Sequence, residues 1–320
     1  SILHAKQSLT SISAKYNIDV LFFDGRGGPP ARGGGKTHKF YASMGNNIEN
    51  EEIQLTIQGQ TITSNFGTLK SAQYNLEQLL SAGISNTVFA ENRIELSPTH
   101  RNLLEELGGI SHQVYQSFKK HPQFLPYMQQ FSPLNYYNKS NIGSRPGKRG
   151  NSDKLVFEDL RAIPFVGSWS QLKQNVPGYF GVGSALQELK NAGRWNEVKS
   201  LFTEVAFFRT LIDNSMMSML KSFFPLTHYI KDDPEFGDVW QMVKDEFDLT
   251  QTLVLELADA TTLMEDDLPG RASIQMRDKI VLPLLTIQQY ALYQIRNHTG
   301  EGPEKEVYEK LITRSMFGII

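Results

Sequence analysis

Residues 20–38 read Val20-Leu21-Phe22-Phe23-Asp24-Gly25-Arg26-Gly27-Gly28-Pro29-Pro30-Ala31-Arg32-Gly33-Gly34-Gly35-Lys36-Thr37-His38. An apolar run, typical of a buried strand, opens into a loop with six glycines, two arginines, a lysine and a histidine. Glycine allows positive φ and lets a ligand approach the main chain closely. Successive exposed N–H groups form concave anion sites, and arginine adds a rigid fork that matches phosphate or carboxylate. The stretch therefore predicts an oxyanion-binding loop at the end of a strand.

The residues on either side of this loop predict an α/β unit. Apolar positions at helical spacing indicate a helix over 3–16, and 18–23 is expected to form the strand. After the loop, residues 53–57 alternate with period two, and 61–63 follow a turn at 58–60, which predicts a short hairpin. Ligands in α/β units collect at the carboxyl ends of strands, where this loop lies.

Helical patterns dominate the rest of the chain. A helix over 69–82 is expected to end at Gly83, and Ser97-Pro98 is expected to begin the next one. Further helices are predicted over 99–107, 110–120, 185–192, 195–208, 212–223, 249–263, 280–294 and 305–313, with a short strand at 160–165. The predicted fold is mostly α with a few β strands, a single body with an α/β unit at 1–65 and a mainly helical part at 66–320.

Composition narrows the class of protein. The 320 residues are 40% hydrophobic and 21% charged, which is ordinary for a globular chain. The net charge of −2 argues against a protein that binds nucleic acid over its whole surface. The absence of cysteine excludes disulfides and thiolate sites. No apolar run approaches the ~18 residues that span a bilayer. The start at Ser1 has neither a signal-peptide pattern nor a methionine, which predicts a fragment or a processed product.

Other interpretations of the glycine-rich loop stay open at this point. Gly35-Lys36-Thr37 is similar to the end of an ATPase phosphate loop, but the glycine required five residues earlier is Pro30. The dinucleotide fingerprint fails at the same residue. Arg26-Gly27-Gly28 and Arg32-Gly33-Gly34 are similar to RNA-binding segments, although those are repetitive and disordered. A flexible surface loop explains the glycines but not the two arginines.

A second basic loop lies at 138–154. It holds Arg145, Lys148 and Arg149 within five residues, and Arg161 follows. One such cluster is usually just solvated, whereas two in one chain favour convergence on one anionic ligand. The seven histidines show no metal-ligand spacing, and His38 at the end of the first loop is the one placed to act on a substrate.

Three ordered motifs resemble the phosphoenolpyruvate carboxylase family. They are Phe23-Asp24-Gly25-Arg26-Gly27-Gly28 with Arg32-Gly33-Gly34-Gly35 and Thr37-His38; Asn141-Ile142-Gly143-Ser144-Arg145-Pro146; and Leu160-Arg161-Ala162-Ile163-Pro164-Phe165 with Trp169 and Gln171. The resemblance covers essentially the whole chain but only the C-terminal part of the family's longer protein. The resemblance implies that this chain forms part of a TIM-like α/β barrel wrapped in helices. It also implies that the full protein is a lyase of carbon dioxide fixation, a homotetramer located in the cytoplasm.

The resemblance also implies a reaction and its residues. Family members join bicarbonate to phosphoenolpyruvate, giving oxaloacetate and phosphate. Arg26 and Arg161, with Gly27 and Gly28, are expected to bind the transferring phosphate. Arg32 is expected over the bicarbonate or carboxyphosphate, and Arg145 is expected to join the same group of anion-binding residues. The required Mg²⁺ or Mn²⁺ is expected to be held upstream of residue 1, together with a catalytic histidine, so the chain alone is predicted to be inactive and to bind no metal. No nucleic acid or membrane partner is expected.

An inhibitor site for aspartate or malate is the remaining implication. Lys221 and Arg277 match the family's cationic residues there, and the inhibitor is expected to draw Arg32 out of the active site.

The sequence departs from the family pattern at Asp24, where the family usually has histidine. An anion at this position repels the substrate unless a cation pairs with it. The alternative function is a non-catalytic module that binds an anionic effector and regulates a partner.

Overall fold

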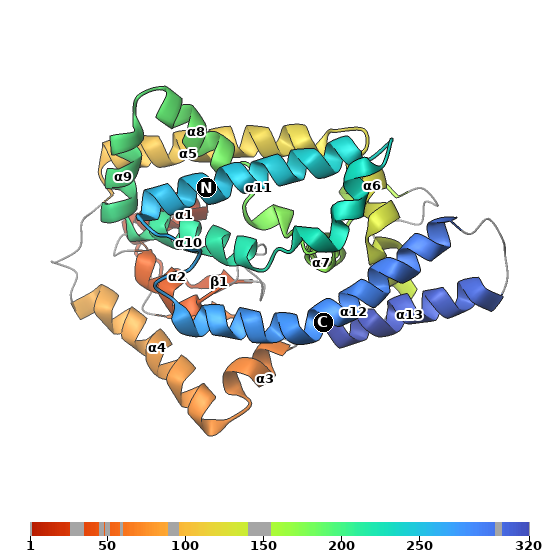
Figure 1. Cartoon of the computed structure of the whole chain (residues 1–320). Helices are drawn as coiled ribbons and strands as arrows, with labels where there is room; N and C mark the ends of the chain where they lie inside the picture. The colour runs from red at the N-terminus through yellow and green to blue at the C-terminus, as the bar shows by residue number, and fades with distance from the viewer. Residues whose placement is uncertain are drawn as a thin grey trace. The chain divides into compact units, whose positions relative to one another are not determined.

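The computed structural model describes residues 2–25, 35–44, 48, 52–57, 60–88, 96–139, 155–297 and 303–319. These residues form a mostly helical protein with one small sheet (Figure 1). The chain divides into two compact units, one of residues 1–108 and 189–214, the other of residues 109–188 and 215–320. The mostly α class predicted from the sequence is confirmed. In the described residues no helix combines the length and hydropathy needed to cross a membrane.

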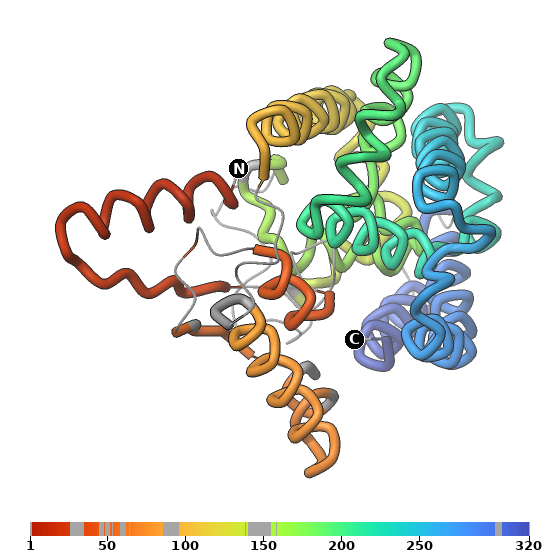
Figure 2. Tube along the Cα trace, turned by 90° about the vertical axis from the view of Figure 1, so that its left-hand side faces the viewer, coloured from red at the N-terminus to blue at the C-terminus, as the bar shows by residue number. Residues whose placement is uncertain are grey.

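The first unit begins with the predicted helix and strand. Helix α1 spans Ile2–Lys15 and ends where Asn17 takes a left-handed conformation (φ 53°). The chain then turns back into β1, Phe22–Asp24 (Figure 2). Side chains of α1, β1 and the following α2, Thr37–Ser43, share one small core around Tyr41. This packing places the end of β1 against two helices.

The predicted hairpin is wrong. Strand β2, Ile53–Leu55, pairs in parallel with β1, with Phe22 opposite Ile53 and Asp24 opposite Leu55. Parallel strands need a crossover, and α2 lies in it. Residues 61–63, expected as the second strand, belong to helix α3, Gln60–Phe66.

Two predicted helix breaks are also wrong. Helix α4, Leu69–Val88, continues through Gly83, and α5, Pro98–Lys119, continues through Gly108 and Gly109. A glycine inside a helix costs only about 1 kcal/mol relative to alanine, so packing along the rest of the helix overrides it. The start of α5 is confirmed, since the Ser97 hydroxyl accepts the His100 N–H at 3.1 Å.

Helices α6, Phe124–Phe131, and α7, Ala162–Gln171, build the second unit with longer helices. The second unit also holds most of α8, Val182–Asn191, and all of α11, Gly237–Ala258, α12, Leu268–Asn297, and α13, Pro303–Ile319. Helix α9, Trp195–Glu204, belongs to the first unit, and α10, Ala206–Leu220, has residues in both. The strand predicted at 160–165 is wrong. Pro164 lies in the first turn of α7, where its missing N–H removes no helical hydrogen bond.

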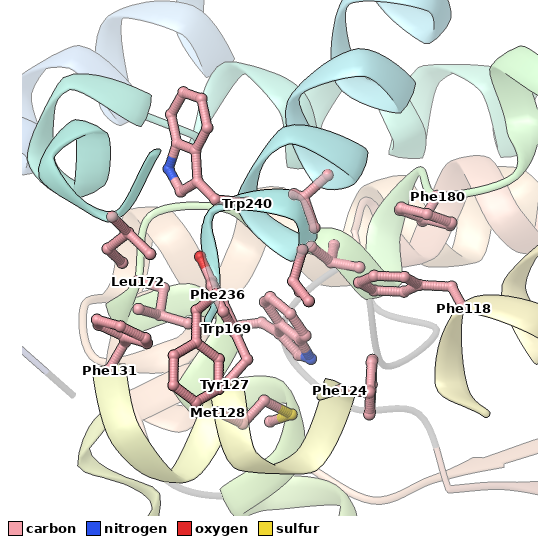
Figure 3. Packing of buried hydrophobic residues seen from close by; sticks show 14 of the residues in the cluster. Phe118, Phe124, Tyr127, Met128, Phe131, Trp169, Leu172, Phe180, Phe236 and Trp240 are labelled. Atoms are coloured by element: carbon pink, nitrogen blue, oxygen red, sulfur yellow. The ribbon is translucent and has the colours of Figure 1, made fainter. Parts of the chain in front are cut away.

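The largest core belongs to the second unit and is aromatic. Trp169 of α7 is fully buried and lies among Tyr127, Phe124 and Phe118 (Figure 3). Tyr127 stacks on Trp169 with ring centroids 6.0 Å apart. Aromatic pairs of this kind add about 0.5–1.5 kcal/mol beyond their buried area. This core fixes α7, and with it the residues at both ends of α7.

Helices α12 and α13 run side by side in the second unit (Figures 1 and 2). A buried chain of amide hydrogen bonds fastens them to α7. Gln288 donates to Gln171 at 2.8 Å and to Ser315 at 3.1 Å, and Gln171 donates to the Tyr137 hydroxyl at 2.8 Å. Buried polar groups that find partners in this way specify one arrangement of the helices.

Candidate functional site

The predicted site residues fall into two groups. Arg26, Gly27, Gly28, Arg32 and Arg145 lie outside the described residues. Arg161, Lys221 and Arg277 lie inside them, all in the second unit. Asp24 and the end of the glycine-rich loop belong to the first unit.

Asp24 closes strand β1 and is paired with a cation. Its Oδ2 atom lies 2.7 Å from the Lys6 ammonium of α1 and accepts a hydrogen bond from the Tyr41 hydroxyl of α2 at 2.7 Å. The side chains of Lys6 and Asp24 are only 9% and 11% exposed. The sequence allowed an anion at this position only with a cation beside it, and Lys6 is that cation.

Gly35 ends the glycine-rich loop in a conformation that favours glycine. Its φ is +93°, and a Cβ atom there would collide with the side-chain oxygen of Asn214. Helix α2 begins two residues later and carries His38. Burial lowers the pKa of His38, and the charges of Lys36 and Lys39 lower it further. The imidazole is therefore kept in its neutral form to lower pH than usual.

Arg161 is the residue immediately before α7, with extended backbone angles of φ −86° and ψ 151°. Its side chain is half-buried, and its Nε atom is buried with no hydrogen-bond acceptor among the described residues. A buried guanidinium N–H without an acceptor is unfavourable by about 1–3 kcal/mol. The Nε–H group of Arg161 is therefore a buried donor without an acceptor among the described residues.

Lys221 and Arg277 are brought together, and Lys173 joins them. Lys221 follows α10, Lys173 follows α7, and Arg277 lies on α12 beside Asp278. The Phe223 N–H donates to the Lys173 carbonyl at 2.7 Å, which holds the segments after α10 and α7 together. The four charged groups act on one another electrostatically, so we name Lys173, Lys221, Arg277 and Asp278 the cation cluster.

Three members of the cation cluster already have partners. The Lys173 ammonium lies 2.6 Å from Asp278 Oδ1, and Lys173 is 4% exposed. The Arg277 guanidinium donates to the Ile319 carbonyl at the end of α13, at 2.7 Å. The half-buried Lys221 ammonium has neither a hydrogen bond nor an ion pair with any described residue. Burial above all, and then Arg277 and Lys173, lower the pKa of Lys221 to about 8.

Sequence reasoning missed Lys173 and Asp278. Lys173 is separated from Lys221 by 48 residues and stands in a turn where its own φ is +54°. The spacing of apolar residues does not predict such a turn. Nothing in the sequence shows that the end of α7 lies near α12. Asp278 directly follows Arg277, which is the one signal that the predicted cation site also contains a carboxylate.

A divalent metal does not fit the described residues. Among them, no three histidine, aspartate or glutamate side chains gather as ligands for an ion. The sequence contains no cysteine that could replace them. We therefore derive no step of a reaction through a metal held by this chain.

Comparisons with known proteins assign the family. The sequence pattern of the family described as phosphoenolpyruvate carboxylase matches residues 1–320. The phosphoenolpyruvate carboxylase of Corynebacterium diphtheriae is 30% identical over 330 residues, which cover 100% of this chain and 36% of that protein. Those of Prochlorococcus marinus strain MIT 9515 and Trichormus variabilis are each 32% identical, covering 95% and 96% of this chain and 32% and 31% of theirs.

The chain belongs to the phosphoenolpyruvate carboxylase family. It spans about a third of the length of the curated relatives that it matches. The resemblance found in the three motifs is thereby confirmed.

Proposed function

We propose that this chain supplies part of a phosphoenolpyruvate carboxylase, which converts phosphoenolpyruvate and bicarbonate to oxaloacetate and phosphate. The family match along all 320 residues carries this proposal. The parallel pair β1–β2, with α2 in the crossover, supports the finer proposal that the first unit contributes strands to an α/β barrel.

The proposed chemistry divides between four arginines. A bicarbonate oxygen attacks the phosphorus of phosphoenolpyruvate, which gives carboxyphosphate and the enolate of pyruvate. Arg26 and Arg161 bind the moving phosphoryl group, while Arg32 and Arg145 bind the bicarbonate. The enolate carbon then attacks the carboxyl carbon and phosphate leaves. Phosphoryl transfer depends mainly on positioning and on charge stabilisation, which forked donors supply.

The surroundings of Arg161 support its assigned role. Its buried Nε atom lacks an acceptor among the described residues, so a phosphate oxygen would satisfy it. Titration calorimetry of the chain with phosphoenolpyruvate tests this role. We expect Arg161→Gln to weaken binding at least tenfold, because a charged hydrogen bond contributes about 1.5–3 kcal/mol. Arg314→Gln, at an exposed position, is the matched control.

The activity test is a coupled assay with malate dehydrogenase. The resemblance puts the metal ligands and the catalytic histidine outside residues 1–320, so we expect no oxaloacetate from this chain alone. Metal-dependent turnover by residues 1–320 would contradict that division of the site. The test and the binding experiment are independent, because a chain without turnover can still bind phosphoenolpyruvate through Arg161.

We further propose that the cation cluster binds a dicarboxylate inhibitor, aspartate or malate. Lys221 and Arg277 are both in it, and Lys221 has no anionic partner among the described residues. Arg32 is proposed as a third contact, which would link the inhibitor to the active site. Calorimetry with aspartate should show binding that Lys221→Ala abolishes and Lys279→Ala, one exposed residue beyond Asp278, preserves.

The second candidate function is a non-catalytic module that binds an anionic effector. The cation cluster favours it, because its Lys221 has no anionic partner among the described residues. The two candidates differ in one measurement. Aspartate binding together with phosphoenolpyruvate binding supports the enzyme, whereas aspartate binding alone supports the module.

A further inference from the structure

A pocket of about 570 Å³ lies in the second unit, lined by residues of α11 and of the 3₁₀ helix η6, Phe224–Asp232. This volume is within the roughly 300–1,000 Å³ typical of small-molecule sites. All of its lining residues are among those that the structure describes. None of them belongs to the cation cluster or to the arginines of the proposed reaction, so the pocket has no role so far.

The buried part of the lining is aromatic. Phe224 and Trp240 are 6% and 2% exposed, and their rings meet edge to face with centroids 5.8 Å apart. The exposed His228 meets the Trp240 ring in the same way at 5.5 Å. The Trp240 indole N–H already donates to Thr227 Oγ1 at 3.2 Å, so its polar atom is satisfied within the fold. Such a wall suits a flat apolar ring.

The charged part of the lining carries one net positive charge. The Lys244 ammonium donates to Asp248 Oδ1 at 2.6 Å and lies 5.6 Å from the centre of the Phe224 ring. Lys231 is exposed, and its ammonium forms no hydrogen bond or ion pair with any described residue. At pH 8 an ordinary imidazole is neutral. Two lysines and one aspartate therefore decide the charge that a ligand meets.

We propose that this pocket binds a small aromatic carboxylate, with its ring against Phe224, Trp240 and His228 and its carboxylate on Lys231. A single negative charge matches the net charge of the lining. A phosphate ester carries a second negative charge, which Asp248 repels. A neutral ring leaves Lys231 without a partner, and a cation meets two lysines. The proposal requires neither the carboxylase reaction nor the inhibitor site.

Three probes separate the ring from the charge. Titration calorimetry of the whole 320-residue chain at pH 8 compares 2-naphthoate with acetate, which has the charge alone, and 2-naphthalenemethanol, which has the ring alone. We expect 2-naphthoate to bind at least about tenfold more tightly than either, because only it uses both parts of the lining. Acetate that binds as tightly as 2-naphthoate, or no binding of 2-naphthoate, would overturn the proposal.

The indole N–H resonances show where the probe binds. The chain has three tryptophans, Trp169, Trp195 and Trp240, and only Trp240 lines the pocket. With ¹⁵N-labelled indoles, 2-naphthoate should shift the Trp240 resonance severalfold more than the other two. Trp240→Phe identifies that resonance by its loss. Equal shifts of all three resonances would show that the probe binds elsewhere and would count against the proposal.

Two variants test the assigned contacts. Lys231→Ala should weaken 2-naphthoate at least about tenfold and leave 2-naphthalenemethanol unchanged, a difference that damage to the fold would not produce. His228→Ala should weaken both naphthalene probes severalfold. Lys279→Ala, at an exposed position of the same unit, is the matched control and should change neither. Equal affinity of 2-naphthoate for wild type and Lys231→Ala would refute the assigned contact.

Discussion

The ammonium of Lys6 lies 2.7 Å from Oδ2 of Asp24, and both side chains are nearly buried. Lys6 comes from α1 and Asp24 from the end of β1, so the pair fastens the helix to the strand that leads into the glycine-rich loop. The Tyr41 hydroxyl donates to the same carboxylate oxygen from α2. One carboxylate therefore joins three elements of the first unit.

Removing one member of this pair should destabilise the first unit strongly. Lys6→Met leaves a buried carboxylate without its cation, which typically costs about 3–5 kcal/mol. Urea unfolding should show a loss of that order, and Lys6→Met/Asp24→Asn should lose less than the sum of the two single variants. Lys39→Met is the control, since Lys39 and Asp213 are 3.7 Å apart and over 40% exposed, and should lose less than about 1 kcal/mol. Equal effects of Lys6→Met and Lys39→Met would contradict this prediction.

The stability of the second unit should depend on pH through Lys221. Its pKa is about 8 in the folded chain and 10.5 ordinarily, so between these values the unfolded chain binds more protons and stability rises with pH. Below pH 8 the folded protein carries the unfavourable charge. Lys221→Met should therefore gain more stability relative to wild type at pH 7 than at pH 10. Urea unfolding measures this, with exposed Lys279→Met as the control; an equal difference at both pH values would contradict it.

Alanine at Gly35 should destabilise the end of the glycine-rich loop. The left-handed backbone there costs a residue with a Cβ atom roughly 1–2 kcal/mol, and the collision with Asn214 adds to this. We expect a loss of about 2 kcal/mol in urea unfolding. Gly35→Ala/Asn214→Ala removes the collision but not the backbone strain, so part of the loss should persist. Full recovery in the double variant would show that the backbone strain was absent.

Alanine at Gly108 should have the opposite effect. Gly108 lies inside α5, and a Cβ atom there meets nothing within 4 Å. Replacing a helical glycine by alanine stabilises by about 0.5–1 kcal/mol, because the unfolded chain loses conformational freedom. Thermal unfolding should show a higher midpoint for Gly108→Ala than for wild type. A lower midpoint would mean that α5 uses its glycines for a contact.

Local chemistry made part of this fold predictable from the sequence. Ser97 begins α5 as expected, because capping depends on residues close in sequence. The strand expected at 160–165 is a helix, because Pro164 is equally compatible with a first helical turn. Residues 53–57 alternate like a hairpin strand, yet the partner of β2 is decided by the distant β1.

The sequence predicted only those residues of the candidate site that belong to a motif of the family. Lys221 and Arg277 came from the resemblance to the family, and the structure brings them together. Lys173 contributes through a turn, and Lys6 reaches Asp24 across 18 residues. Such contacts depend on how elements pack, and no periodicity or spacing in the sequence encodes them.

The sheet of the first unit consists, in the described residues, of two parallel strands with three residues each. A ladder that short is not stable by itself, so its order depends on the helices packed against it. Amide hydrogen exchange in β1 should therefore follow the docking of α1 and α2, not the strength of the ladder. Hydrogen exchange of the β1 amides would therefore report whether the contacts of Asp24 with Lys6 and Tyr41 are formed.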